Sequence, residues 1–200
     1  MGHRFGKASG EQYLRLEKRC RMTKHTLIAL VENKPGVLNR MASLFRRRGF
    51  NIESIAVGHS EVPHLSRMTI VVGGTAGMVE QVRKQLDKVV DVVRVSDLTE
   101  TDLVSRELAL IKVKSTSSTR SEIMQIVDIF RANIVDVAFD SLTVEVTGDE
   151  DKIDSLFNLL RGFGVKELAR TGRIAMTRGV SSPLPVDKES SNTRAKKRKT

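Results

Sequence analysis

The sequence has few of the residues from which catalytic and metal centres are usually built. It contains one cysteine, Cys20, and four histidines that are scattered without the spacing of metal ligands. A single cysteine excludes an internal disulfide and a cysteine-based zinc site, and it favours a reducing cytoplasm as the compartment. No carboxylate pair, Ser/His/Asp set or Cys/His arrangement stands at a telling spacing. We therefore expect neither catalysis nor a metal on this chain.

Aromatic residues and long apolar runs are also scarce. Aromatic side chains make up 4% of the chain, with one Tyr and no Trp, so few rings could stack on nucleic-acid bases. No apolar run approaches the ~20 residues that cross a membrane, and the charged N-terminus lacks the apolar core of a secretory signal. These absences argue against a membrane protein and against a base-stacking surface.

Positive charge is abundant, but it is concentrated at the two ends. The net charge is +10, yet residues 1–22 and 179–200 each carry +4, and residues 23–178 carry only +2. We therefore expect two mobile basic tails around a nearly neutral body, which argues against a nucleic-acid-binding surface. Met22 directly precedes the first strand, so a translation start there would remove the first tail.

Between the tails, residues 23–98 and 99–178 repeat one order of elements: strand, helix, strand, strand, helix, strand. The apolar periodicity predicts both units. In the first we expect a strand at 26–31, a helix from Val37 to Arg48, strands at 51–58 and 67–73, a helix at 76–88 and a strand at 92–95. In the second we expect a strand at 108–113, a helix after Thr119, strands at 134–138 and 142–147, a helix after 149–151 and a strand at 165–169, with 174–176 adding a further strand.

This repeat predicts an α+β protein made of two ferredoxin-like βαββαβ sandwiches, each with its helices on one face of an antiparallel sheet. The linker between them is expected near 97–105. Thr119 and Glu122 match a capping box at the start of the second unit's first helix. Asp149 to Asp151 place acidic side chains at the positive end of its second helix.

The most informative segment is the first turn, residues 32–38 (ENKPGVL). Gly36 allows close backbone approach, and the N–H groups of residues 36–38, with the helix dipole, offer a carboxylate site. The amide of Asn33 could bind an α-amino or carboxylate group. The alternative is that Asn-x-Pro-Gly is only a strand-to-helix turn. The corresponding turn of the second unit, residues 115–119, has neither Asn nor Gly, so a ligand is expected on the first unit alone.

The remaining polar residues are interpreted as structural. Three arginines at 46–48 are expected to form a solvated cap on a helix C-terminus, followed by Gly49. His59 and His64 flank a loop. Three further arginines are expected to be surface charges: Arg131, Arg161 and Arg173.

Several longer segments resemble a known family. The first unit contains LIALVENKPGVLNRMASLFRRRGFNIESIAVG, LSRMTIVV and VVDVVRVSDL, and the second contains SRELALIKV, IFRANIVDVAFDSLTVEVTG and ARTGRIAMTRG. These are similar to the N-terminal ACT domain and the C-terminal domain of the acetolactate synthase (acetohydroxyacid synthase) small subunit. The resemblance covers about residues 24–179. RRGFNIESIAVG together with LSRMTIVV is its specific signature, because the turn alone would indicate only some ACT domain.

The resemblance implies a non-catalytic regulatory subunit. Such a subunit binds the large catalytic subunit, raises its activity and confers feedback inhibition by valine, or in some members by leucine or isoleucine. No cofactor is then expected on this chain, whereas thiamine diphosphate, Mg and FAD are expected on the large subunit. A homodimer through the ACT domains and a cytoplasmic location are implied as well.

The resemblance also assigns residues to the effector site. Asn33, Gly36 and Leu38 match the family's effector-binding turn, and Val37 lies within it. Asn51 matches a second contributor that is supplied across the ACT dimer interface. Val31 and Val57 are assigned to the apolar wall of this site only because they stand beside the other site residues.

Two rival functions from other classes stay open at this point. A stand-alone amino-acid sensor could act on another partner, nucleic acid included, through its basic tails. An enzyme in its own right finds no site. The same fold hosts RNA-binding domains, but those carry exposed aromatics on their central strands, and residues 68–72 carry none.

Overall fold

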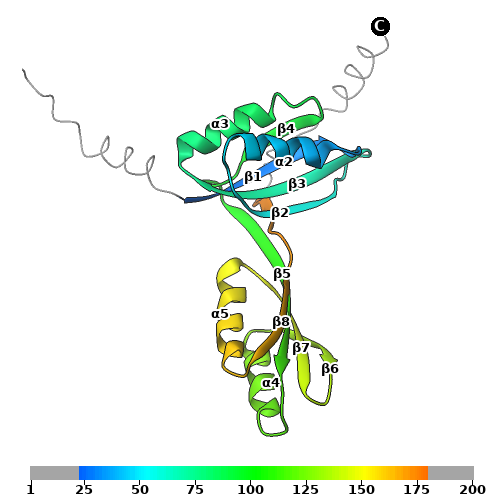
Figure 1. Ribbon diagram of the computed structural model, residues 1–200, viewed down its shortest axis with the longest axis vertical. Coiled ribbons are helices and arrows are strands. Elements are labelled where there is room, and N and C mark those ends of the chain that lie inside the picture. Colours follow the sequence, from blue (N-terminus) through cyan, green and yellow to red (C-terminus); the bar gives the residue numbers. More distant parts are fainter. Residues whose placement is uncertain (1–22, 180–200) are drawn as a thin grey trace, which may run out of the picture.

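The computed structural model describes residues 23–179, which form two domains stacked along the long axis of the molecule (Figure 1). Each domain is an antiparallel sheet with two helices on one face, and the sheet has four strands in the N-terminal domain and five in the C-terminal domain. The α+β class and the two ferredoxin-like sandwiches expected from the repeat are confirmed. The predicted basic tails lie outside the described residues.

The N-terminal domain has the strand order β2-β3-β1-β4. Both β1 and β2 run antiparallel to β3, so they run in the same direction. The ferredoxin-like order follows from the sequence order of the elements, which are β1 (Thr23–Glu32), α2 (Val37–Arg47), β2 (Ile52–His59), β3 (Leu65–Gly74), α3 (Ala76–Leu86) and β4 (Val92–Asp97).

The central strand β1 is buried on both faces. Leu27, Ala29 and Val31 face the helices, where Met41 and Phe45 of α2 complete the core. On the opposite face, Ile28 and Leu30 pack with Leu98 from the linker. Because both faces exclude water, the strand is a nearly continuous apolar run rather than an alternating one.

The C-terminal domain repeats this plan with the strand order β6-β7-β5-β8. Apolar side chains from its sheet and helices form a second core, which includes Ile111, Val144 and Leu156. Its elements are β5 (Leu103–Lys114), α4 (Arg120–Ile129), β6 (Asn133–Val137), β7 (Ser141–Gly148), α5 (Glu150–Arg161), β8 (Val165–Arg170) and β9 (Ile174–Thr177).

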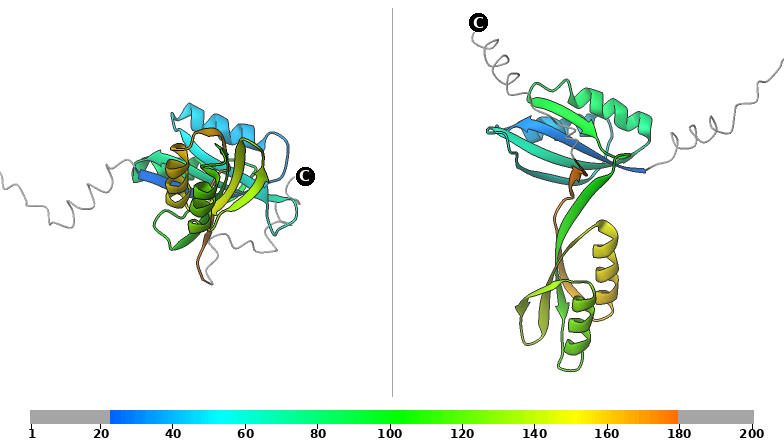
Figure 2. Two further views of the ribbon diagram at one scale, coloured as in Figure 1. Left: turned by 90° about the horizontal axis from the view of Figure 1, so that it is seen from below. Right: turned by 180° about the vertical axis from the view of Figure 1, so that it is seen from behind.

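Strand β5 begins earlier than the sequence predicted, and the linker is correspondingly shorter. The strand expected at 108–113 spans Leu103–Lys114, so residues 103–105 belong to the sheet instead of the linker. The extension exists because β9 pairs with residues 103–106, while β8 pairs with the later half of the same strand. A single strand thus runs from one domain into the other (Figure 2).

The predicted capping box at Thr119 is wrong. Thr119 has helical backbone angles and no side-chain bond to the helix, so it cannot act as an extended N-cap. Its hydroxyl instead accepts the N–H of Thr116 at 3.0 Å. At α5 the expectation about charge is confirmed, and Asp149 caps that helix by accepting the N–H of Lys152 at 3.0 Å.

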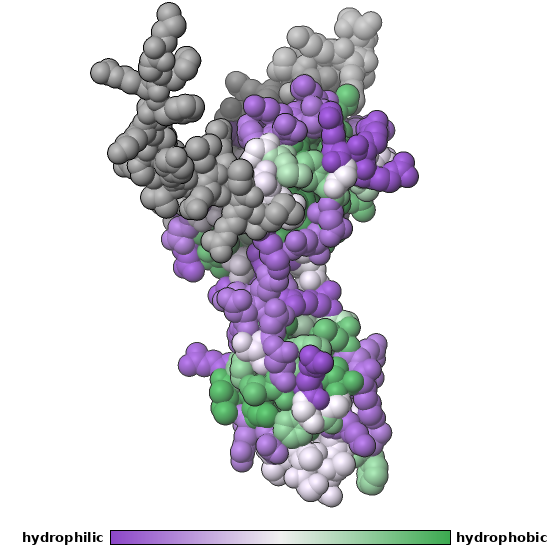
Figure 3. All heavy atoms as spheres, turned by 60° about the vertical axis from the view of Figure 1, so that its left-hand side comes forward, coloured by the Kyte–Doolittle hydropathy of each residue, from purple (hydrophilic) through white to green (hydrophobic). Residues whose placement is uncertain are grey.

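The surface differs between the junction of the domains and the C-terminal domain. Figure 3 shows hydrophilic side chains over the narrow region between the two domains and an apolar area on the C-terminal domain. None of the helices described between residues 23 and 179 is long and apolar enough to span a bilayer.

The helix face of β1 should dominate the stability of the N-terminal domain. Phe45 is 1% exposed within this core, so we expect Phe45→Ala to lower the free energy of unfolding by about 3–5 kcal/mol. Leu38 on the same helix is 52% exposed, and Leu38→Ala should change it by about 0.5 kcal/mol or less. Urea unfolding followed by circular dichroism checks both, and equal losses in the two variants would contradict this core.

Candidate functional site

The first turn is held at its base by two backbone hydrogen bonds. The N–H of Glu32 donates to the carbonyl of Asp91, and the N–H of Asn33 donates to the carbonyl of His64, both at 2.8 Å. His64 has a positive φ of 67°, which turns the loop before β3 toward β1. These bonds fix the backbone of the turn while the side chain of Asn33 stays exposed.

Gly36 sets the geometry of the helix start. It is the N-cap of α2 with φ 85° and ψ −10°, the left-handed region that suits glycine, and it makes no side-chain cap. A Cβ at this position would meet nothing within 4 Å, so the space above it is open. Among the described residues, no backbone carbonyl receives the N–H of Gly36 or Leu38. The turn therefore presents unpaired donors at the positive end of a helix, which is an anion-binding arrangement.

The apolar residues assigned to the site divide into exposed and buried pairs. Leu38 and Val57 are 52% and 51% exposed, and both lie at the end of the sheet where β1 and β2 finish. Val37 and Val31 are only 4% and 2% exposed and belong to the core. Leu38 and Val57 could line an apolar wall directly, whereas the two buried valines lie beneath it.

The structure does not bring Asn51 to the first turn within one chain. Asn33 follows the end of β1, while Asn51 precedes the start of β2, and the two strands run in the same direction. The eight residues of β2 therefore separate them by roughly 26 Å at about 3.3 Å per residue. Asn51 could reach an effector at Asn33 only from a second copy of the chain.

Charged side chains stiffen the surroundings of the turn. Arg40 of α2 forms an ion pair with Asp91, whose side chain is 6% exposed, and this links the helix to the start of β4. Lys34 donates to Glu32 at 2.7 Å. The sequence did not predict that Asp91 and His64 hold the turn in place. The signal that could have indicated Asp91 is an acidic residue flanked by valines on both sides.

The corresponding turn of the C-terminal domain is filled by its own side chains. Arg120 donates to the carbonyls of Ala138 and Phe139 at 2.8 and 3.0 Å, and to the hydroxyl of Ser115. The N–H of Thr119 is bonded to Thr116. The N–H of Thr119 and the guanidinium of Arg120 thus have partners inside this turn, whereas no backbone carbonyl of the described residues receives the N–H of Gly36 or Leu38.

The other predicted sites have simple positions in the structure. Arg46 and Arg47 end α2, Arg48 is its C-cap, and Gly49 has a positive φ of 69°. His59 and His64 are exposed. Within residues 23–179, no group of three or more His, Cys, Asp or Glu is arranged to hold a metal ion. Arg173 is not the surface charge that the sequence suggested, because its side chain is 17% exposed and lies between the domains.

Two family models match the chain, one for each domain. A model described as an AHAS small subunit-like ACT domain matches residues 27–94, and one described as the small subunit of acetolactate synthase matches residues 106–179. A curated relative from Archaeoglobus fulgidus, "Probable acetolactate synthase small subunit", is 58% identical over 78% of this chain and 98% of its own length. The "Acetolactate synthase small subunit" of Mycobacterium bovis is 50% identical over 78% of this chain and 92% of its own length.

A solved structure agrees with the sequence relatives. The crystal structure of the acetolactate synthase small subunit from Thermotoga maritima has a TM-score of 0.74 and 46% identity, covering 80% of this chain and 99% of that one. The fold and the first turn define a protein with an ACT domain followed by a second ferredoxin-like domain. The sequence and structural matches are more specific: the chain belongs to the family of acetolactate synthase small subunits.

The left-handed backbone of Gly36 gives a stability prediction that does not depend on any ligand. Gly36→Ala has room for its methyl group but must adopt a positive φ, so we expect the N-terminal domain to lose about 1–2 kcal/mol of stability. Gly58→Ala is the matched control, since Gly58 is also in open space and has no positive φ, and it should be neutral or slightly stabilising. Thermal unfolding distinguishes the two, and a neutral Gly36→Ala would show that the turn is not held in this conformation.

Proposed function

We propose that this chain is the regulatory subunit of acetolactate synthase: it activates the large catalytic subunit and makes it sensitive to feedback inhibition by a branched-chain amino acid, valine in first place. The observation that carries the proposal is that the N–H groups of Gly36 and Leu38 in the first turn are open to a ligand, in a chain of this family. The reaction itself, with thiamine diphosphate, Mg and FAD, would belong to the large subunit. We place the complex in the cytoplasm.

The chemistry of the first turn suits a free amino acid with a branched side chain. Its carboxylate would accept the N–H groups of Gly36 and Leu38 at the positive end of α2. The exposed amide of Asn33 can accept from an α-ammonium group or donate to a carboxylate. The side chains of Leu38 and Val57 supply apolar surface for a short aliphatic group.

A homodimer would complete this site. β2 is the edge strand of its sheet, and its Val57 is half exposed. In a two-fold dimer the same surface of each copy is used, so a residue at one end of the strand can meet the opposite end of the partner's strand. Such an arrangement would bring Asn51 of one copy to Asn33 of the other and create two identical sites.

Regulation would follow from the shared site. An amino acid that contacts both copies binds best to the dimer arrangement in which Asn33 and Asn51 meet, and it therefore shifts the population toward that arrangement. The large subunit responds if its activity differs between the two arrangements.

Removing the Asn33 amide should separate sensing from assembly. We expect Asn33→Ala to weaken valine binding by about ten-fold or more, because a lost polar partner leaves the ligand's charged group unpaired. Binding to the large subunit should stay unchanged. Calorimetry with valine and a pull-down with the large subunit measure the two effects. Asn39→Ala, an exposed asparagine in the first turn of α2, is the matched control and should alter neither. Loss of both functions in Asn33→Ala would mean that the site is misplaced.

Mixing two weakly binding variants tests the shared site. As separate dimers, Asn33→Ala and Asn51→Ala should each bind valine about ten-fold or more weakly than the parent, so neither has a site of parental affinity. In a heterodimer, one site carries both substitutions and the other carries neither, so the mixture should recover about half of the sites in the mixed species. Calorimetry after co-refolding measures this recovery. If no site is recovered, Asn33 and Asn51 do not act across a dimer interface.

A further inference from the structure

The last residue of β8 and the segment that joins it to β9, together residues 170–173, lie directly against β2 of the N-terminal domain. A Cβ on Gly172 would overlap the carbonyl oxygen of Ile55 and would lie 2.5 Å from the carbonyl carbon of the same residue. Both atoms belong to backbone, so they cannot move aside as a flexible side chain could. Gly172 has no positive φ, and the need for glycine here is therefore one of space alone. Even one methyl group would have to push the two domains apart.

Hydrogen bonds fix this segment on the same strand and its neighbour. The N–H of Arg173 donates to the hydroxyl of Ser54 at 2.8 Å. Two residues further along, the carbonyl of Ala175 accepts from the guanidinium of Arg67 on β3 at 2.8 Å. Ala175 is 2% exposed, Arg67 is partly buried, and this burial lowers the pKa of the Arg67 guanidinium.

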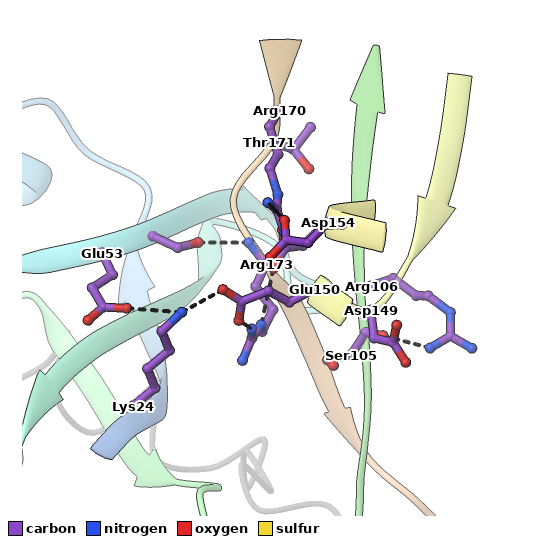
Figure 4. Close-up of polar contacts among 12 residues, drawn as sticks. Lys24, Glu53, Ser105, Arg106, Asp149, Glu150, Asp154, Arg170, Thr171 and Arg173 are labelled. Carbon is purple, nitrogen blue, oxygen red and sulfur yellow. Dashed lines mark hydrogen bonds and ion pairs between the residues drawn. The ribbon is translucent and has the colours of Figure 1, made fainter. Parts of the chain in front are cut away.

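A chain of ion pairs encloses the contact. Arg173 bonds to Glu107 of β5 and Glu150 of α5, and Glu150 in turn bonds to Lys24 of β1, which lies 3.5 Å from Glu53 of β2. Figure 4 shows Lys24 between Glu53 and Glu150, with Arg173 beside Glu150. The hydrogen bond from Lys24 is the main cause that holds the pKa of Glu150 below its ordinary value. Glu107 is 7% exposed and also binds Arg170, so its charge is paired twice.

Strand β2 carries this contact on one face and the proposed effector wall on the other. Ser54 pairs with Val71, which lies on the sheet face away from the helices, whereas Val57 pairs with Met68 of the helix-side core. The register shifts between Ile52 and Ser54, so Glu53 occupies a bulge only two residues from Asn51. Bulges of this kind redirect side chains next to functional sites. One short edge strand therefore connects Asn51 to the segment 170–173.

We propose that residues 170–173 transmit effector occupancy from β2 to the C-terminal domain, with Gly172 and Arg173 as positioning residues for regulation. A ligand that draws Asn51 toward a partner's Asn33 displaces β2. Because Gly172 packs so closely against the Ile55 carbonyl that no Cβ fits between them, the C-terminal domain moves together with β2. This inference rests on the proposed function and adds the physical route by which the signal leaves the ACT domain.

The test uses the full chain assembled with its large subunit and the variant Gly172→Ala. We expect valine affinity, measured by calorimetry, to stay within about two-fold of the parent, because the first turn is untouched. The valine concentration for half-inhibition of acetolactate formation, relative to each variant's own activity, should rise by about ten-fold or more. Gly162→Ala is the matched control in the same domain, since its Cβ would make only ordinary contact at 3.6 Å, and it should be inhibited like the parent.

A second variant covers the case in which Gly172→Ala folds poorly. Ser54→Ala adds no atoms and removes the acceptor of the Arg173 N–H, and it should raise the half-inhibitory concentration by roughly three- to ten-fold.

The distance between spin labels attached at Lys88→Cys and Gln125→Cys, in a chain that also carries Cys20→Ser, reports the arrangement of the two domains. In the parent this distance should shift with valine, and in Gly172→Ala it should broaden and lose that shift.

The outcomes separate the two proposals. A parent chain that binds no valine contradicts the proposed function and this inference with it. A parent that binds valine, while Gly172→Ala and Ser54→Ala are inhibited as the parent is, overturns the transmission route alone. Loss of inhibition with binding retained supports it.

Discussion

The contact between the backbone of Gly172 and the carbonyl of Ile55 fixes the arrangement of the two domains. Strand β5 connects them covalently, and this contact joins the two domains at a second place. The ion pairs from Glu107 through Arg173 and Glu150 to Lys24 surround it. Partly exposed pairs contribute little stability one by one. Here the ion pairs orient the two domains relative to each other, because each pair joins two different elements of the fold.

The two domains share one fold and differ in what they do with the same turn. In the N-terminal domain, Gly36 leaves helix donors open to solvent, and no side chain covers them. In the C-terminal domain, the hydroxyl of Thr116 accepts the N–H of Thr119, and the guanidinium of Arg120 donates to the carbonyl of Ala138. The two copies of one architecture thus differ in the contacts that their first turns make, so fold alone does not define function.

Local patterns in the sequence predicted what depends on local structure. The apolar periodicity gave the order of the elements, and Gly36 and Asp149 start their helices as their residue types suggest. Contacts between distant segments were not predictable. The Thr119 side chain does not cap its helix, β5 is extended by pairing with β9, and Arg173 is part of an interdomain network. The separation of Asn33 from Asn51 required the strand order, and whether they meet depends on a second copy.

The central claim is that this chain senses a branched-chain amino acid on behalf of a catalytic partner. The most direct measurement is acetolactate formation by the large subunit of the same organism, alone, with this chain, and with this chain plus valine. The account predicts a higher rate when the chain is added and a lower rate when valine follows, with no effect of valine on the large subunit alone. A rate that does not respond to the chain, or a stimulated rate that ignores every branched-chain amino acid, would contradict it.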